Sequence, residues 1–491
     1  MTVLQGPDWT AQGLDIRAGR YPLSVERHVM RMADLLVPGV TTVTPHARYY
    51  ALHALIAAEA ADRELTALET QDLLRRAEVA LAAVSYAHDH GDSGLPRAHG
   101  TDALAGVLHS GEIDMTEASQ PRKGGYVRNV WGFWNPYAAS EVTLRILARA
   151  SMPVPGGACD AESIRSGIGG LLDLAREPRL IVSNLTDRSE LCVCSGGHAA
   201  DGRWLARLLC AQDADSASGA GGGARQETIR LIAQVMETHE IADAANDIGL
   251  VLAFGDFVTT DPVTADLSAT LVWRGVVLRN YAVGAWRRLW SWMVEQVEGL
   301  MQVGDFTDHF ADAFPDGTVG AFLDGLPATT TSSGAPAPAE QHLRDSDRPL
   351  PVRELAVLGV SARRVGELSG RVRDAFLGQR GVELGPEWMS WRFAEAQAMP
   401  LRDFARMLAA DLLVRGQRVA LSKARRLPDG ILWLPTRLHE RGDLLFRTSQ
   451  EGRGDVGLRL DQLTTVLAGA GVLQRIDGRW RMTQAGEGFL G

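Results

Sequence analysis

The 491-residue chain has almost no lysine and very little cysteine. Only Lys123 and Lys423 are lysines, so 48 of the 50 basic residues are arginine, a bias typical of a GC-rich bacterial genome. Four cysteines in a chain of this length exclude a disulfide framework. No run of eighteen apolar residues occurs, and the N-terminus lacks the pattern of a signal peptide. We therefore expect a soluble, cytoplasmic protein without membrane contact.

The common catalytic motifs are also missing. Neither the phosphate-binding G-x-x-x-x-G-K-[ST] loop nor the G-x-S-x-G elbow occurs. His239-Glu240 lacks the second histidine of H-E-x-x-H, because Asp243 stands in its place. These absences argue against a P-loop NTPase, a serine hydrolase of the elbow type and a zinc metalloprotease. We expect a protein without chemistry of its own and without a cofactor.

The composition predicts two domains joined by a linker. Residues 328–339 are small, polar and proline-rich with no apolar period, so residues 328–350 are interpreted as a linker. It separates a helical domain, residues 1–327 with a mobile loop at 212–226, from a C-terminal domain, residues 351–491. That second domain carries 22 basic against 16 acidic residues, whereas the rest of the chain has a net charge of −16. Such asymmetry is one sign of a module that faces nucleic acid, and it equally fits an ordinary protein surface, because a nucleic-acid interface needs the charge clustered on one face.

The apolar spacing is mostly helical. It predicts helices after Ser24, from Thr44-Pro45 as N-cap and first helical residue, and over residues 66–86, 225–239 and 280–300. Strand patterns are sparse, and Leu180-Ile181-Val182 is the clearest. The expected fold class is mainly α.

The C-terminal end predicts a winged helix over residues 456–491. A helix over 457–471 precedes two alternating segments around Asp477-Gly478, a strong signal for a hairpin, and a short helix follows. Such a module binds DNA or docks a protein, and the fold alone does not decide between them. Asp461 and Asp477 would repel a phosphate backbone. The residues that we expect to contact DNA or a partner are Arg459, Gln462, Thr464, Thr465, Arg475, Arg479 and Arg481.

Two groups of potential metal ligands stand out, and for both we favour a reading without metal. His88, Asp89, His90 and Asp92 contain the His-Asp pair of metal-dependent phosphohydrolases, but they fall in a loop at a helix end. In the second group, Cys192-Val193-Cys194 is too tight for a zinc knuckle, and Cys210 sits in an apolar helix. His198 is the remaining candidate ligand of that group.

Three segments resemble a family of large, uncharacterised proteins from bacterial defence islands. Residues 38–50 are similar to its P-G-x-T-x-x-T-x-x-x-R-Y-Y motif, residues 75–79 to its R-R-x-E-V helix, and residues 132–136 to an aromatic turn. The resemblance implies a component of a multi-protein anti-phage system whose partners supply motor or nuclease activity. Within the first motif, Arg48 and Tyr49 are either a partner-facing handle or an internal brace, and we favour the brace.

The sequence as a whole favours a non-catalytic binding or scaffold subunit. It would dock the other protein subunits of its system, and the winged helix would engage double-stranded DNA or a partner. A metal-dependent phosphohydrolase or nuclease built on His88, Asp89, His90 and Asp92 is one alternative. A kleisin-like architectural subunit or a transcriptional regulator is another.

Overall fold

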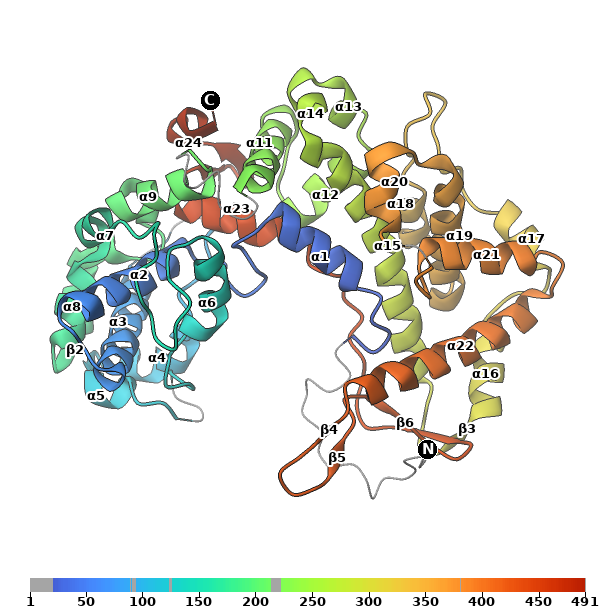
Figure 1. The fold of residues 1–491 in the computed structure, drawn as a ribbon, viewed down its shortest axis with the longest axis horizontal. Coiled ribbons are helices and arrows are strands. Elements are labelled where there is room, and N and C mark those ends of the chain that lie inside the picture. Colours follow the sequence, from blue (N-terminus) through green and yellow to red (C-terminus); the bar gives the residue numbers. More distant parts are fainter. Residues whose placement is uncertain are drawn as a thin grey trace. The chain divides into compact units, whose positions relative to one another are not determined.

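The computed structural model describes residues 21–88, 90, 94–122, 126–212, 222–379 and 381–490. The fold is mainly helical, as the apolar spacing predicts, and its few strands form small antiparallel sheets (Figure 1). Among the described residues, no helix has the length and apolar character needed to cross a membrane. The chain divides into two compact units, and each combines segments that lie far apart in the sequence.

The first unit comprises Met1–Met32, Leu252–Val258 and Leu271–Val456. Four of the five boundaries between the units lie within helices α1 (Arg27–Leu36), α12 (Ala244–Phe254), α13 (Phe257–Thr260) and α15 (Ser268–Glu295). The helices that follow are α16 (Val303–Asp312), α17 (Val319–Asp324), α18 (Ala339–Arg344), α19 (Leu350–Glu367), α20 (Gly370–Leu377), α21 (Pro386–Glu395) and α22 (Leu401–Ser422). The strands are β3 (Met301–Gln302), β4 (Arg425–Arg426), β5 (Leu432–Trp433), β6 (Leu438–Arg441) and β7 (Leu444–Arg447). They pair in the orders β3-β7-β6 and β4-β5.

Aromatic side chains fill the core of the first unit. Trp273 and Trp286 on α15 are buried, and the indole N–H of Trp286 donates to the carbonyl of Leu384 at 2.9 Å. Phe393 of α21 stacks on Phe404 of α22 with the ring centroids 5.2 Å apart. Trp273 and Trp286 are therefore core residues, and the one polar group of the Trp286 indole is satisfied inside the core.

The segment predicted as a linker is part of this core, so the boundary at 328–350 is wrong. The guanidinium of Arg364 on α19 donates to the carbonyls of Thr329 at 3.0 Å and Ala337 at 2.7 Å. It also pairs with Glu340 on α18 at 2.6 Å. This polar, proline-rich segment is ordered because its backbone carbonyls accept hydrogen bonds from a buried arginine. The composition of the segment does not reveal that contact.

The second unit comprises Ala33–Val251, Thr259–Thr270 and Gly457–Gly491. Its helices are α2 (Ala47–Asp62), α3 (Ala67–Ala87), α4 (Thr101–His109), α5 (Met115–Ala118), α6 (Trp134–Thr143), α7 (Ala161–Ile168), α8 (Gly170–Arg176), α9 (Ala200–Leu209), α11 (Gly222–Thr238), α14 (Pro262–Asp266), α23 (Leu460–Gly469) and α24 (Gln484–Leu490). Two 3₁₀ helices, η2 (Val182–Leu191) and η3 (Gly196–His198), follow β2. Strand β1 (Glu112–Asp114) pairs with β2 (Arg179–Ile181), and β8 (Leu473–Ile476) pairs with β9 (Arg479–Met482).

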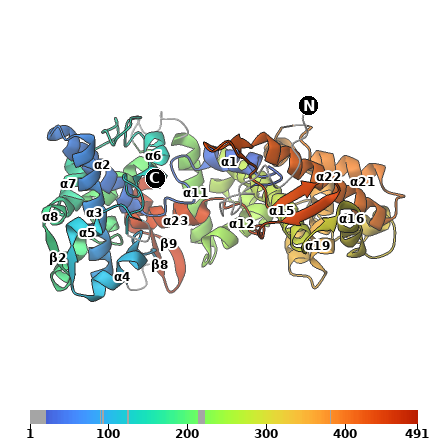
Figure 2. The same cartoon turned by 90° about the horizontal axis from the view of Figure 1, so that it is seen from below.

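The C-terminal helix, hairpin and helix belong to this second unit. The predicted order of elements is confirmed, with β8 and β9 directly after α23 (Figure 2). The predicted domain of residues 351–491 is wrong, because residues up to Val456 belong to the first unit. The excess of basic residues over 351–491 is therefore divided between two units. Residues 457–491 alone hold four arginines against three acidic residues.

Helix starts follow local chemistry where the side chains allow it. Thr66 caps α3 with a capping box, in which its hydroxyl accepts from the Glu69 N–H and the Glu69 carboxylate accepts from the Thr66 N–H. The predicted cap at Thr44-Pro45 is wrong, because Thr44 closes a turn with Thr41 and α2 begins at Ala47. The predicted mobile loop at 212–226 is wrong at its end, since Gly222 opens α11; residues 213–221 lie outside the described part.

The three segments that resemble the defence-island family meet in the core of the second unit. Tyr50 in the first donates its hydroxyl to the carbonyl of Gly39 in the same segment at 2.8 Å. Glu78 in the second accepts from the backbone N–H of Phe133 in the third at 2.8 Å. Gly132 has a φ of 49°, and a Cβ there would collide with the Glu78 carboxylate. These residues therefore build the interior of the unit.

A buried ionic network lies at this meeting point. Nδ1 of His53 on α2 is 2.5 Å from the Glu141 carboxylate on α6, and Nε2 is 3.6 Å from Glu78 on α3. All three side chains are fully buried. Burial opposes the charge of His53, but the charge of Glu141 and hydrogen bonds to both carboxylates raise its pKa to about 9. Burial raises the pKa of both Glu141 and Glu78.

The network predicts that stability falls as the pH rises. A histidine whose pKa is raised on folding stabilises the protein fully below its unfolded pKa, and that contribution disappears as the pH passes the folded value. For His53 this window runs from pH 6.5 to about pH 9. The raised pKa values of the two carboxyls act in the same direction. We expect the free energy of unfolding to drop by about 3 kcal/mol across the window, measured by urea unfolding at several pH values. A flat profile would contradict this expectation.

Candidate functional site

The C-terminal helix–hairpin module is fixed on the second unit by its own apolar stripe. Leu463, Val466 and Leu467 of α23 are buried, and α23 contacts α2, α9 and η3. Its first turn is held by Arg459, which has a φ of 66°. The Arg459 guanidinium donates to the carbonyl of Val40 at 2.9 Å and pairs with Asp34.

The hairpin turns where the sequence predicts. Asp477 and Gly478 both have positive φ, 50° and 76°, as a two-residue hairpin turn with right-handed twist requires. The backbone N–H of Trp480 donates to the carbonyl of Ile241 at 2.8 Å. The Arg481 guanidinium donates to the carbonyl of Met236 on α11 at 2.6 Å. The hairpin is thus attached to the unit along β9.

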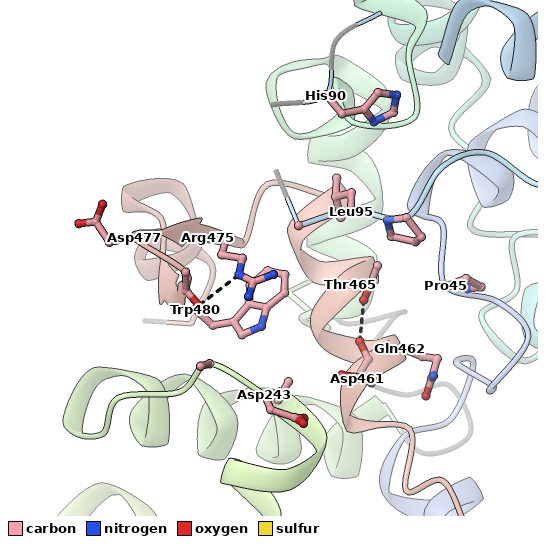
Figure 3. A pocket seen from close by; sticks show the side chains of 15 residues that line it. Pro45, His90, Leu95, Asp243, Asp461, Gln462, Thr465, Arg475, Asp477 and Trp480 are labelled. Atoms are coloured by element: carbon pink, nitrogen blue, oxygen red, sulfur yellow. Dashed lines mark hydrogen bonds between the residues drawn. The ribbon is translucent and has the colours of Figure 1, made fainter. Parts of the chain in front are cut away.

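A pocket of about 1170 Å³ lies beside α23 and the hairpin. One wall is the exposed face of α23, with Asp461, Gln462 and Thr465, and the hairpin adds Arg475 and Trp480 (Figure 3). Ala242–Ala244, at the start of α12, and the chain around His90 and Leu95 complete the lining. In Figure 3, Asp243 and Asp461 lie near the first turn of α23, and His90 lies beyond its opposite end.

The pocket carries more acidic than basic groups. Asp243, Asp461 and Asp477 line it, against Arg475 as the single arginine among its described lining residues. Burial, and then the charge of Asp243, raises the pKa of Asp461. The Asp243 carboxylate accepts from the backbone N–H of Asn246 at 3.0 Å. So far as the described residues show, none donates to the Asp461 carboxylate, so a cation brought between the two aspartates would be stabilised.

The seven residues expected to contact DNA or a partner fall into three groups. Arg459 and Arg481 serve the packing of the module, and Thr464 is fully buried, so none of these three presents its polar group to a ligand. Arg479 is exposed and pairs with Glu240 at 2.5 Å. The remaining three, Gln462, Thr465 and Arg475, line the pocket.

Arg48 and Tyr49 do not face a partner. Their side chains are 1% and 0% exposed. Arg48 donates to the carbonyls of Glu190 at 2.5 Å and Cys192 at 2.9 Å and pairs with Asp201 at 3.3 Å. Tyr49 stacks on Tyr137 with a centroid distance of 5.6 Å. The internal brace is therefore the correct interpretation.

The fold places candidate metal ligands from both predicted groups next to one another. Asp89 and Asp92 lie outside the described residues, whereas His88 and His90 are described and lie against Cys194 and Cys192. His198 belongs to η3, and Cys210 is the buried C-cap residue of α9. The fold thus brings together two residues of the first predicted group and two of the second. Neither pair suggests a metal site by itself in the sequence, because the other pair lies about a hundred positions away.

The comparisons with known proteins add no relative. No family model matches the chain, and no curated protein or solved structure matches it either.

Proposed function

We propose that this chain is a non-catalytic binding subunit whose helix–hairpin pocket takes a basic segment of a partner protein. The observation that supports this most is the pair Asp243 and Asp461, which faces the pocket with negative charge that the described residues leave uncompensated. An arginine or lysine side chain entering there gains charge-assisted hydrogen bonds.

Protein docking is favoured over DNA binding by the surface of α23. A recognition helix enters the major groove with several polar side chains exposed. On α23, Leu460, Leu463, Thr464, Val466, Leu467 and Gly469 are buried. The exposed face that remains carries Asp461, and Asp243 lies beside it. A phosphate backbone would meet negative charge at this position.

The wider role follows from the resemblance in the three core segments. We propose that the partner is another subunit of a bacterial multi-protein system, in keeping with anti-phage defence. In such a system the present chain would contribute recognition, and its partner would contribute motor or nuclease activity.

Peptide binding to the full chain tests the proposal. A fluorescent oligo-arginine peptide is titrated with the wild type and with the double variant Asp243→Asn/Asp461→Asn, and anisotropy is followed. Asparagine keeps the capping contact to Asn246 while it removes the charge. Loss of two charge-assisted contacts to these exposed carboxylates should weaken binding about tenfold, which corresponds to about 1.4 kcal/mol for the two together.

Matched controls separate this site from the overall acidity of the protein. Asp102 and Asp173 are exposed residues of the same unit outside the pocket, and Asp102→Asn/Asp173→Asn removes the same charge. This variant should bind like the wild type. Equal binding by both double variants would contradict the proposal. So would tight, salt-dependent binding of a DNA duplex that Arg475→Ala abolishes.

A further inference from the structure

Two short segments bring two histidines and two cysteines together in the second unit. His88 is the C-cap residue of α3, and His90 follows two positions later. Cys192 and Cys194 directly follow η2, which packs along α3. The backbone N–H of Val193 donates to the Ser85 hydroxyl at 3.2 Å, and Arg48 holds the carbonyl of Cys192. The cysteine segment is thus fixed against the end of α3.

The distances among His88, Cys192 and Cys194 are those of a small coordination sphere, and His90 lies beside Cys192. The sulfur atoms of Cys192 and Cys194 are 3.3 Å apart. Cys194 Sγ lies 3.3 Å from Nδ1 of His88, and Cys192 Sγ lies 3.4 Å from Nε2 of His90. One ligand atom each from His88, Cys192 and Cys194 lies within 4.8 Å of the other two.

These separations can be compared with a tetrahedral zinc site. Zn–S bonds of about 2.3 Å and Zn–N bonds of about 2.0–2.1 Å place two sulfurs about 3.8 Å apart and a sulfur and a nitrogen about 3.6 Å apart. The observed distances are a few tenths of an ångström shorter. They remain far longer than a disulfide bond of about 2.05 Å. The pair is therefore arranged as two separate sulfur ligands, and both cysteines are free.

The surroundings also suit a metal. His90 Nε2 lies 2.6 Å from the Ser85 carbonyl, and His90 Nδ1 is buried without a partner. A ligating histidine commonly gives one ring N–H to a carbonyl and the other nitrogen to the metal.

We propose that His88, Cys192 and Cys194 bind a structural Zn²⁺ ion, and that a shift of the His90 side chain brings its unpartnered Nδ1 in as the fourth ligand. Two sulfurs and two imidazole nitrogens in tetrahedral arrangement are a donor set that selects zinc. The ion joins the end of α3 to the segment after η2. Because His90 also lines the helix–hairpin pocket, the ion fixes one edge of that pocket. This inference does not depend on what the pocket binds.

The metal content of the purified full chain tests the site. Elemental analysis should find about one zinc per chain in the wild type, because a closed structural site retains its ion. Cys194→Ser and His88→Ala should each lose most of that zinc. Cys159→Ser is the matched control, since Cys159 is a half-buried cysteine outside the cluster, and it should keep the full content.

A second measurement covers variants that fail to fold. The wild type is stripped of metal with a chelator and titrated with Co²⁺, which should produce the sulfur-to-metal charge-transfer bands and the intense visible bands of tetrahedral cobalt. Zinc should then displace the cobalt and abolish these bands. Metal-free wild type that develops no such bands would overturn the proposal. So would a Cys192–Cys194 disulfide in the purified protein, located by peptide mapping of non-reduced protein.

Discussion

Replacing His53 with alanine is expected to lower the free energy of unfolding of the second unit by about 3–5 kcal/mol, measured by urea unfolding at pH 6.5. His53 lies 2.5 Å from Glu141 and 3.6 Å from Glu78, and none of the three has access to solvent. Without the imidazole, two buried carboxyl groups face each other across a cavity. They must either remain charged at a high cost or take up protons.

The variant should also change the pH dependence. In the wild type, the fall in the free energy of unfolding between pH 6.5 and about pH 9 comes from the titration of His53, so the variant should lack it. Protonation of the two carboxyls should make the variant more stable in acid. His109→Ala is the control, because His109 is an exposed histidine in the same unit. A loss below about 1 kcal/mol in His53→Ala, equal to the surface control, would show that the network is not ionic.

Replacing Arg364 with methionine should destabilise the first unit to a similar extent, by about 3–5 kcal/mol. Arg364 is fully buried and makes two hydrogen bonds to Glu340, at 2.6 and 2.7 Å, besides those to the carbonyls of Thr329 and Ala337. Methionine fills much of the volume but leaves the Glu340 carboxylate and two carbonyls unpaired. Residues 329–340 should become sensitive to proteases, which limited proteolysis would detect.

A second substitution separates the charge from the packing. In Arg364→Met/Glu340→Leu the buried carboxylate is also removed, and the double variant should recover part of the lost stability. Arg371→Met is the control, because Arg371 is exposed on α20. If residues 329–340 stay protected in Arg364→Met, the arginine is not what orders them, and the segment would have to be held by its own turn between Thr331 and Ala335.

Several elements were predictable because neighbouring residues determine them. Thr66 and Glu69 close a capping box three positions apart, so α3 begins where the sequence places it. Asp-Gly accepts two successive positive φ angles, so the hairpin at Asp477-Gly478 was also predictable. Thr44-Pro45 shows the limit of local rules. The Thr44 hydroxyl accepts a hydrogen bond from the backbone N–H of Thr41, and this local turn replaces the predicted helix cap.

The candidate site was only partly predictable. Gln462, Thr465 and Arg475 line one pocket, whereas their contact with DNA or a partner stays a prediction. The sequence could not show that Asp243, more than two hundred positions away, stands beside Asp461. Nor could it show that Arg459 and Arg481 are used for packing, because an arginine that holds a carbonyl and one that faces solvent look alike in a sequence.

The order of helices, the hairpin turn and the shortage of catalytic motifs can be read from this chain directly, because each depends on residues within a few positions of one another. The division into units, the burial of Arg48 and Arg364 and the meeting of His88 and His90 with Cys192 and Cys194 cannot. Each depends on contacts between residues that are 24 to 425 positions apart. Such contacts form only when the apolar faces of whole helices are buried against one another. The local pattern of side chains does not determine which faces pack together.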